Sequence, residues 1–119
     1  MANPNIVSVT AIYGKTVGAV LTTSSADILT NSASSGKIFK VNTILCANID
    51  GVNNADLTVG VFDASASATY YLAYTITVPA DSSIDVLGKS IYLEEGDKIV
   101  GLASAASDLN LVISYEEIN

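Results

Sequence analysis

Hydrophobic and polar residues alternate along most of this chain with a period of two. Successive side chains of a β-strand point to opposite faces, so alternation over a short segment predicts a strand with one buried face. The longest alternating segment is 37–49. Its predicted buried face consists of Phe39, Val41, Leu45, Ala47 and Ile49, and its opposite face carries Lys40, Asn42 and Asn48.

Turn-forming residues separate the segments that follow. Asp50-Gly51 and Asn53-Asn54 tolerate the positive φ angles of hairpin turns, so they predict a β-hairpin over 37–62. A loop of small residues, 64–68, predicts a second hairpin between 56–63 and 70–78. The predicted apolar faces of its strands are Leu57, Val59 and Val61 in the first, and Leu72, Tyr74, Ile76 and Val78 in the second. Pro79 ends the second strand because it has no N–H to donate.

The remaining segments are shorter. Ile84, Val86, Ile91 and Leu93 predict brief extended pieces, 94–97 is a turn, and 98–104 and 109–117 are strands, the last with Leu109, Leu111, Ile113 and Tyr115 on one face. In the first third, 6–9, 18–23 and 26–30 are candidate strands, 31–36 is a loop, and residues 1–8 are alternatively an extended arm. No segment predicts a helix. About seven to nine short strands with regularly spaced turns predict an all-β, single-domain antiparallel β-sandwich over residues 1–119, of jelly-roll or immunoglobulin-like type.

Composition limits the chemistry that such a fold can carry. Half of the 119 residues are hydrophobic and 14% are charged, which excludes intrinsic disorder. The chain contains no His and a single Cys, and it lacks the Gly-x-Ser-x-Gly and phosphate-loop motifs. We therefore expect a non-enzyme without a catalytic residue, cofactor or metal site. The net charge of -7, with only five Lys, argues against binding to nucleic acid or to an anionic membrane.

Several polar and reactive residues have a plain structural interpretation. Cys46 lies in an apolar run, so we expect a small buried side chain and a reduced thiol. The acidic pairs 94–95 and 116–117 are expected to be solvated charges, because neighbours in an extended chain point to opposite faces. The segment from Asp50 to Asp56 carries four side-chain oxygen donors. A Ca²⁺ loop and an ordinary turn both remain open for it, although its spacing is not that of an EF-hand.

Tyrosines and the N-terminus supply the candidate partner-binding residues. Tyr74 and Tyr115 fall on predicted apolar faces and are expected at the edge of the core. Tyr70 and Tyr71 are left open between that role and an exposed contact with a partner. Pro4 biases the preceding residue to an extended conformation, so Asn3-Pro4-Asn5 is expected to form an arm that lies on a neighbouring subunit.

Four segments carry a resemblance to a known group of proteins. These are Ile12-Tyr13-Gly14-Lys15-Thr16, Gly36-Lys37-Ile38-Phe39-Lys40-Val41-Asn42, Val78-Pro79-Ala80-Asp81 and Ile91-Tyr92-Leu93-Glu94-Glu95-Gly96-Asp97. Together they resemble small all-β virion structural proteins of tailed phages, especially marine and cyanobacterial ones. The resemblance implies a virion component and leaves its location in the particle open.

The expected function is that of a capsid decoration, or cement, protein that stabilises the head shell through protein–protein contacts. Its expected partners are the major capsid protein or other virion proteins, and we expect a homo-oligomer, a trimer in the first place. The acidic charge suits the capsid exterior, and the free thiol and the absence of a secretion signal suit assembly in the host cytoplasm. Two alternatives remain: a tail or fibre component that contacts a receptor through Tyr70 and Tyr71, and a stand-alone carbohydrate-binding module.

Overall fold

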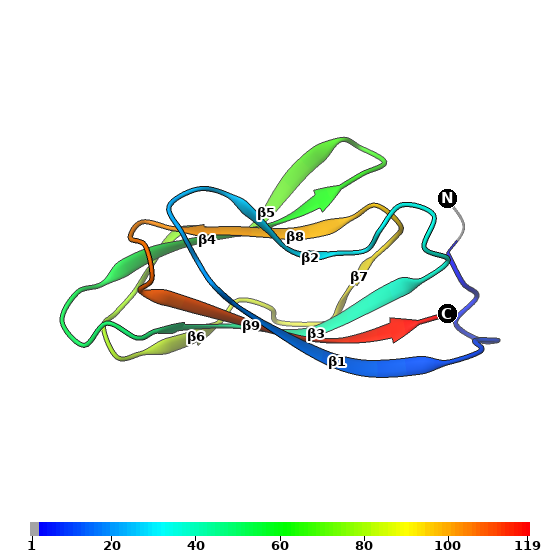
Figure 1. Ribbon diagram of the computed structural model, residues 1–119, viewed down its shortest axis with the longest axis horizontal. Coiled ribbons are helices and arrows are strands. Elements are labelled where there is room, and N and C mark those ends of the chain that lie inside the picture. The colour runs from blue at the N-terminus through cyan, green and yellow to red at the C-terminus, as the bar shows by residue number, and fades with distance from the viewer. Residues whose placement is uncertain (1–2) are drawn as a thin grey trace.

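The computed structural model describes residues 3–119 and consists of two stacked β-sheets (Figure 1). The strands are β1 (Ile12–Val20), β2 (Ala26–Thr30), β3 (Ile38–Asn48), β4 (Ala55–Asp63), β5 (Ala68–Val78), β6 (Ser83–Asp85), β7 (Ile91–Leu93), β8 (Lys98–Ala103) and β9 (Leu109–Ile118). The described residues contain no helix. The predicted all-β sandwich is therefore confirmed.

Strand order identifies the type of sandwich. The larger sheet has the order β1-β9-β3-β6, with β7 pairing β3 beside β6, and the smaller sheet has the order β2-β8-β4-β5. All pairs are antiparallel. If β6 and β7 are counted as one interrupted strand, each sheet has four positions, and the chain moves from one sheet to the other at almost every connection. This is the arrangement of a jelly roll rather than of an immunoglobulin domain.

The predicted hairpin over 37–62 is wrong. Strand β3 belongs to the larger sheet and pairs with β9, whereas β4 belongs to the smaller sheet and pairs with β5 and β8. The turn residues after Asn48 do reverse the chain, but they carry it across the sandwich instead of back along β3. The second predicted hairpin, between β4 and β5, is confirmed.

The predicted buried face of β3 is correct only in its first half. Phe39 and Val41 are buried, but the register with β9 shifts between Val41 and Thr43. A bulge of one residue exchanges the two faces of a strand. Beyond it the buried side chains are Ile44, Cys46 and Asn48, while Leu45 and Ile49 are 38% and 58% exposed and Ala47 is partly exposed.

The core fills the space between the two sheets with aliphatic side chains. Its fully buried members include Val41, Ile44, Leu57, Val59, Leu93, Ile99, Leu109, Leu111 and Ile113. Strand β9 has the alternation expected from the sequence, and Tyr115 at its end is buried against Phe39, with ring centroids 5.1 Å apart. This prediction for Tyr115 is confirmed.

The first third of the chain differs from its predicted strands. Residues 6–8 form a turn and a bend where a strand was expected over 6–9, and the first strand, β1, begins at Ile12 rather than at residue 18. The predicted strand over 26–30 and the loop over 31–36 are both present. Of the expected arm, residues 1 and 2 lie outside the described residues. The segment that follows them runs close to the C-terminus, where Thr10 and Ala11 donate their N–H groups to the carbonyl of Asn119.

Candidate interaction surface

Three tyrosines gather on β5, which lies at the margin of the smaller sheet. Tyr70, Tyr71 and Tyr74 are 60%, 54% and 65% exposed, and the rings of Tyr71 and Tyr74 meet edge to face with centroids 4.9 Å apart. The hairpin of β4 and β5 projects from the body of the sandwich (Figure 1). Tyr71 and Tyr74 share one face of this hairpin, while Tyr70, which precedes Tyr71 without a register shift, points to the other face. We call these three residues the tyrosine surface. Exposed tyrosines on a projecting element suit contact with a partner, because the ring is apolar and the hydroxyl remains hydrated.

Bulges in β5 explain why Tyr71 and Tyr74 lie on the same face of the hairpin. Residues three apart in a regular strand lie on opposite faces, yet Tyr71 and Tyr74 touch. Register with β4 shifts once around Leu72 and again before Ile76. At the second shift Thr75 adopts a φ of 49° and donates its N–H to Oγ1 of Thr58 at 3.1 Å.

The bulges correct the predicted orientation of this strand. Ala73 is buried in place of Tyr74, whose expected position at the edge of the core is therefore wrong, and Ile76 is 36% exposed. Tyr70 and Tyr71, whose position was left open, are both exposed, and their contact with a partner stays a prediction.

Gly60 on β4 makes room for the tyrosine surface. A Cβ atom at this position would lie 2.8 Å from Cγ2 of Thr69 and 3.0 Å from Cδ1 of Tyr71. The ring of Tyr71 therefore lies against bare backbone. On the same face Lys98 lies 5.4 Å from the ring centroid of Phe62 and forms an ion pair with Asp27 at 3.1 Å.

The N-terminal candidate residues occupy a separate place. Asn3 and Asn5 are exposed and Pro4 is partly buried. Oδ1 of Asn5 accepts a hydrogen bond from the N–H of Val7, and the carbonyl of Asn5 accepts one from Ser8, so a turn follows the proline. Within residues 3–119, no hydrogen bond or ring contact joins this segment to the tyrosine surface.

The acidic pairs are less solvated than expected. Glu94 is exposed and Glu116 is partly buried, but Glu95 and Glu117 are 3% and 8% exposed. Glu95 accepts a hydrogen bond from the N–H of Gly36 at 2.7 Å. The prediction of solvated charges is thus wrong for Glu95 and Glu117, because each carboxylate is buried and accepts hydrogen bonds from residues distant in sequence.

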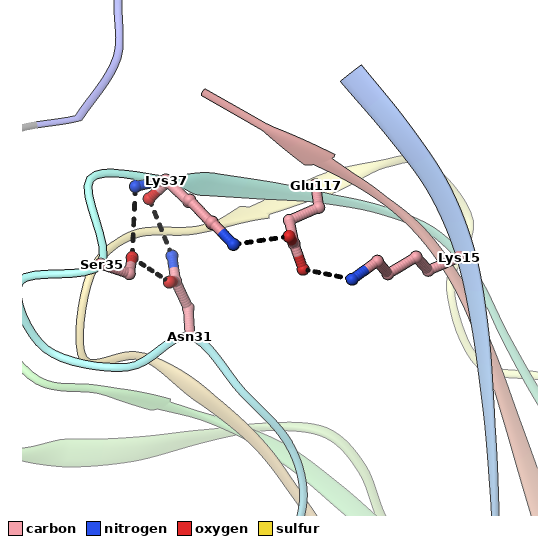
Figure 2. A network of polar contacts seen from close by, with 5 residues as sticks. All are labelled: Lys15, Asn31, Ser35, Lys37 and Glu117. Carbon is pink, nitrogen blue, oxygen red and sulfur yellow. Dashed lines mark hydrogen bonds and ion pairs between the residues drawn. The ribbon is translucent and has the colours of Figure 1, made fainter. Parts of the chain in front are cut away.

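Glu117 is the centre of a polar network at that end (Figure 2). Its carboxylate lies 2.7 Å from Nζ of Lys37 and 3.1 Å from Nζ of Lys15. The hydrogen bond from Lys37 is the largest cause that lowers the pKa of Glu117, and burial opposes it. The neighbouring Glu116 points the other way and accepts a hydrogen bond from Asn42. The two carboxylates of this pair therefore do not converge.

Nearby, Asn31 connects the two sheets at the end of β2. Its side-chain Nδ2 donates to the carbonyls of Lys37 and Leu93, both at 3.0 Å, and its Oδ1 accepts from Oγ of Ser35 at 2.6 Å. Asn31 is completely buried. The sequence places this residue in a loop but does not predict its role, since no local signal distinguishes it from an exposed turn asparagine.

Cys46 is buried, as predicted from its apolar surroundings. Burial raises the pKa of its thiol to about 11. A protonated and inaccessible thiol is a poor nucleophile and a poor partner for disulfide exchange.

Three of the four oxygen-bearing side chains of the Asp50–Asp56 segment accept separate hydrogen bonds. Oδ1 of Asp50 accepts from the N–H groups of Val52 and Asn53, and these bonds are the largest causes that lower the pKa of Asp50. Asn54 accepts from the N–H of Ala80, and Asp56 accepts from the hydroxyl of Thr77. The segment thus has the hydrogen bonding of an ordinary connection between the sheets.

Within residues 3–119 there is no pocket and no group of three His, Cys, Asp or Glu side chains placed to hold a metal ion. This part of the chain also has no helix long and apolar enough to cross a membrane.

Comparisons with known proteins concern the fold. No family model matches the sequence, and no curated protein matches it. Among solved structures, a protein from a study entitled "Bacillus endospore appendages form a novel family of disulfide-linked pili" has a TM-score of 0.51 at 16% identity, over 89% of this chain and 85% of that one. A pentameric capsid protein from metagenomic phage sequences has a TM-score of 0.43 at 18% identity, over 85% of this chain and 59% of that one. At 16% identity, the match to the pilus protein shows similarity of fold alone.

Proposed function

We propose that this chain is a structural subunit of a virion, and specifically a non-enzymatic decoration protein that stabilises the capsid shell by protein–protein contacts. The observation that carries the proposal is the tyrosine surface. Tyr70, Tyr71 and Tyr74 are more than half exposed on a projecting edge, where they add nothing to the core. Clustered exposed apolar side chains mark contact sites, and buried tyrosines are frequent anchors of interfaces.

The resemblance of four sequence segments to phage virion proteins supplies the choice of partner. The major capsid protein or another virion protein would receive the tyrosine surface on the outside of the shell. The N-terminal segment around Pro4 would lie on a neighbouring subunit. A weak contact at each copy suffices, because many copies act together on one particle.

The pilus protein of similar fold shows that a chain of this architecture can build an assembly. The pili that it forms are disulfide-linked, and a link of that kind is not open to this folded chain. The single cysteine, Cys46, is buried with a raised thiol pKa. The contacts proposed here are therefore non-covalent.

A second candidate, a tail or fibre component, is favoured by the projection of the β4–β5 hairpin (Figure 1). A receptor would then contact Tyr70 and Tyr71. Position and copy number in the particle separate the two functions.

The test is localisation by cryo-electron microscopy, with quantitative mass spectrometry of purified particles. We expect density on the head exterior and a copy number comparable to that of the major capsid protein. Density confined to the tail, with far fewer copies, would favour the second candidate. Absence from the particle would overturn both.

A binding assay tests the surface itself. The double variant Tyr70→Ser/Tyr71→Ser should lose binding to shells that lack the protein. Tyr92→Ser is the matched control, because Tyr92 is 45% exposed on β7, in the other sheet. Equal binding by both variants would contradict the role of the tyrosine surface.

A further inference from the structure

The two sheets have four edges at which a further strand could pair, and at three of them the edge strand is short or bulged. Strand β2 has five residues and a register shift, β5 has two shifts, and β6 and β7 have three residues each. Short or bulged edges discourage pairing between molecules. Strand β1 is different: it has nine residues, and its register with β9 is continuous from Ile12 to Val20. It contains no proline and one lysine, Lys15.

The hydrogen bonds at its two ends show which backbone groups of β1 are free. Ala11 and Asn119 exchange two hydrogen bonds, each 3.0 Å long, and Leu21 donates to the carbonyl of Leu109 at 2.9 Å. Hydrogen-bonded pairs alternate along an antiparallel ladder, so the odd-numbered residues of β1 face β9. The N–H and C=O groups of the even-numbered residues therefore point outward along the free edge. No residue of β1 is classed as buried.

The same even-numbered residues have a symmetric side-chain pattern. Val17 pairs with the buried Ile113, so the side chains at odd positions of β1 lie on the inner face of the sheet, toward the core. The side chains at even positions lie on its outer face, in solvent. The outward series reads Ile12, Gly14, Thr16, Gly18 and Val20. Read in either direction from Thr16, it presents a glycine and then a β-branched aliphatic residue. The two aliphatic ends, Ile12 and Val20, are 54% and 57% exposed.

The isolated chain gives no reason for the two glycines. A Cβ at Gly14 would meet nothing within 4 Å, and one at Gly18 would meet only the carbonyl oxygen of Leu111 at 3.9 Å. Neither has a positive φ. Glycine weakens a strand interior and often marks the place where another backbone approaches closely.

We propose that two copies of this chain associate by antiparallel pairing of β1 with β1 across a two-fold axis at Thr16. In this register Ile12 lies opposite Val20 of the second copy, Gly14 opposite Gly18, and Thr16 opposite its own counterpart. Every free N–H and C=O of the edge then has a partner, and the exposed aliphatic ends cover each other. The larger sheets of the two copies become one continuous sheet.

Charge does not oppose this pairing. Lys15 is the only charged residue of β1, and it is neutralised by Glu117 of its own chain at 3.1 Å. On the inner face it would lie opposite Val17 of the second copy. The pairing does not depend on a role in a virion, so the two proposals fail separately.

Cross-linking tests the register. Paired residues at the axis have Cα atoms about 5.5 Å apart, which is within disulfide range. Thr16→Cys should therefore form a covalent dimer under mild oxidation, as seen on a non-reducing gel. Gly14→Cys is the matched control, because its counterpart lies four residues away along the ladder, at about 13 Å. A monomeric Thr16→Cys, or equal cross-linking of the control, would overturn the register.

Mass in solution, measured by light scattering on the full chain, tests the association. We expect the wild-type chain to have twice its 12.3 kDa mass, or an even multiple. Ile12→Lys/Val20→Lys places like charges opposite each other and should give monomers, while Ile12→Lys/Val20→Glu should restore pairing. Both positions are exposed, so the fold should survive, which circular dichroism would check. A wild-type monomer or trimer, or no rescue by the opposite charges, would overturn the proposal.

Discussion

Removing the side chain of Asn31 tests whether one buried amide holds the two sheets together at the end of β2. Its Nδ2 donates to the carbonyl of Lys37, just before β3, and to that of Leu93 in β7. Strand β2 belongs to the smaller sheet, and β3 and β7 belong to the larger one. The amide therefore bridges the layers, and Asn31→Ala leaves both carbonyls without this donor. Figure 2 shows the bond to Lys37.

The magnitude follows from the burial of the two carbonyls. The hydrogen bond to Leu93 is buried, and leaving such an acceptor unsatisfied costs about 1–3 kcal/mol. The bond to Lys37 is partly buried and contributes about 0.5–1.5 kcal/mol. Their sum, about 1.5–4.5 kcal/mol, is a large fraction of the roughly 5–15 kcal/mol that stabilises a typical domain.

Urea denaturation followed by circular dichroism measures this loss. Asn3→Ala is the control, because Asn3 is exposed and should leave the free energy of unfolding unchanged. Asn31→Asp should be destabilised at least as much as Asn31→Ala, since a carboxylate cannot donate to the two carbonyls. A loss below about 0.5 kcal/mol for Asn31→Ala, the range of ordinary surface substitutions, would refute the bridging role.

Three further predictions concern single positions. Glu117→Gln should lower stability at neutral pH. The pKa of Glu117 is lower in the folded than in the unfolded state, so the carboxylate stabilises the fold above its unfolded pKa. This stabilisation is lost as the pH falls through the folded pKa. Urea denaturation at several pH values should therefore show that the difference in unfolding free energy between wild type and Glu117→Gln shrinks below about pH 4. Cys46 should resist a thiol reagent at pH 8 in the native protein and react fully in denaturant, whereas rapid native labelling would contradict its burial. Gly60→Ala should lower the free energy of unfolding by about 1–3 kcal/mol through crowding, while Gly88→Ala, with open space around its Cβ, should not.

Period-two alternation was sufficient to predict the fold class and several strands. In β9 the pattern runs unbroken from Leu109 to Tyr115, so burial follows the residue type directly. The β4–β5 hairpin was also predictable, because a loop of small residues joins two alternating segments. These elements are regular, and their local sequence agrees with their final environment.

Bulges limit the prediction of which side chains of a strand are buried. In β3 the shift after Val41 places Cys46 in the core and Leu45 at the surface, and in β5 the shifts expose Tyr74. A bulge adds one residue without a distinctive sequence signal, and a slip of one residue exchanges the faces of everything beyond it. Thr75, with its φ of 49°, is not a residue that pattern reasoning would place in such a conformation.

Long-range polar contacts and the pairing of strands could not be predicted from the sequence either. The residues after Asn48 are typical of a hairpin turn, but residues of the same kind also form the connection from β3 to β4 in the other sheet. Asn31 and Glu117 read as exposed polar residues because their partners lie elsewhere in the sequence. Glu117, for example, is paired with Lys37, 80 residues away. Only the assembled sandwich brings these groups together.

The two proposed contacts depend on different physics, because the two edges differ in regularity. Bulges make the backbone of β5 unsuitable for pairing and place Tyr71 and Tyr74 on one exposed face, so that edge binds through side chains. Strand β1 has small or modest outward side chains and a regular backbone, so its edge binds through hydrogen bonds. The contacts should therefore be separable: Tyr70→Ser/Tyr71→Ser should weaken binding to a shell and leave the dimer intact. Conversely, Ile12→Lys/Val20→Lys should give monomers that still bind, more weakly, because each then attaches through one tyrosine surface instead of two.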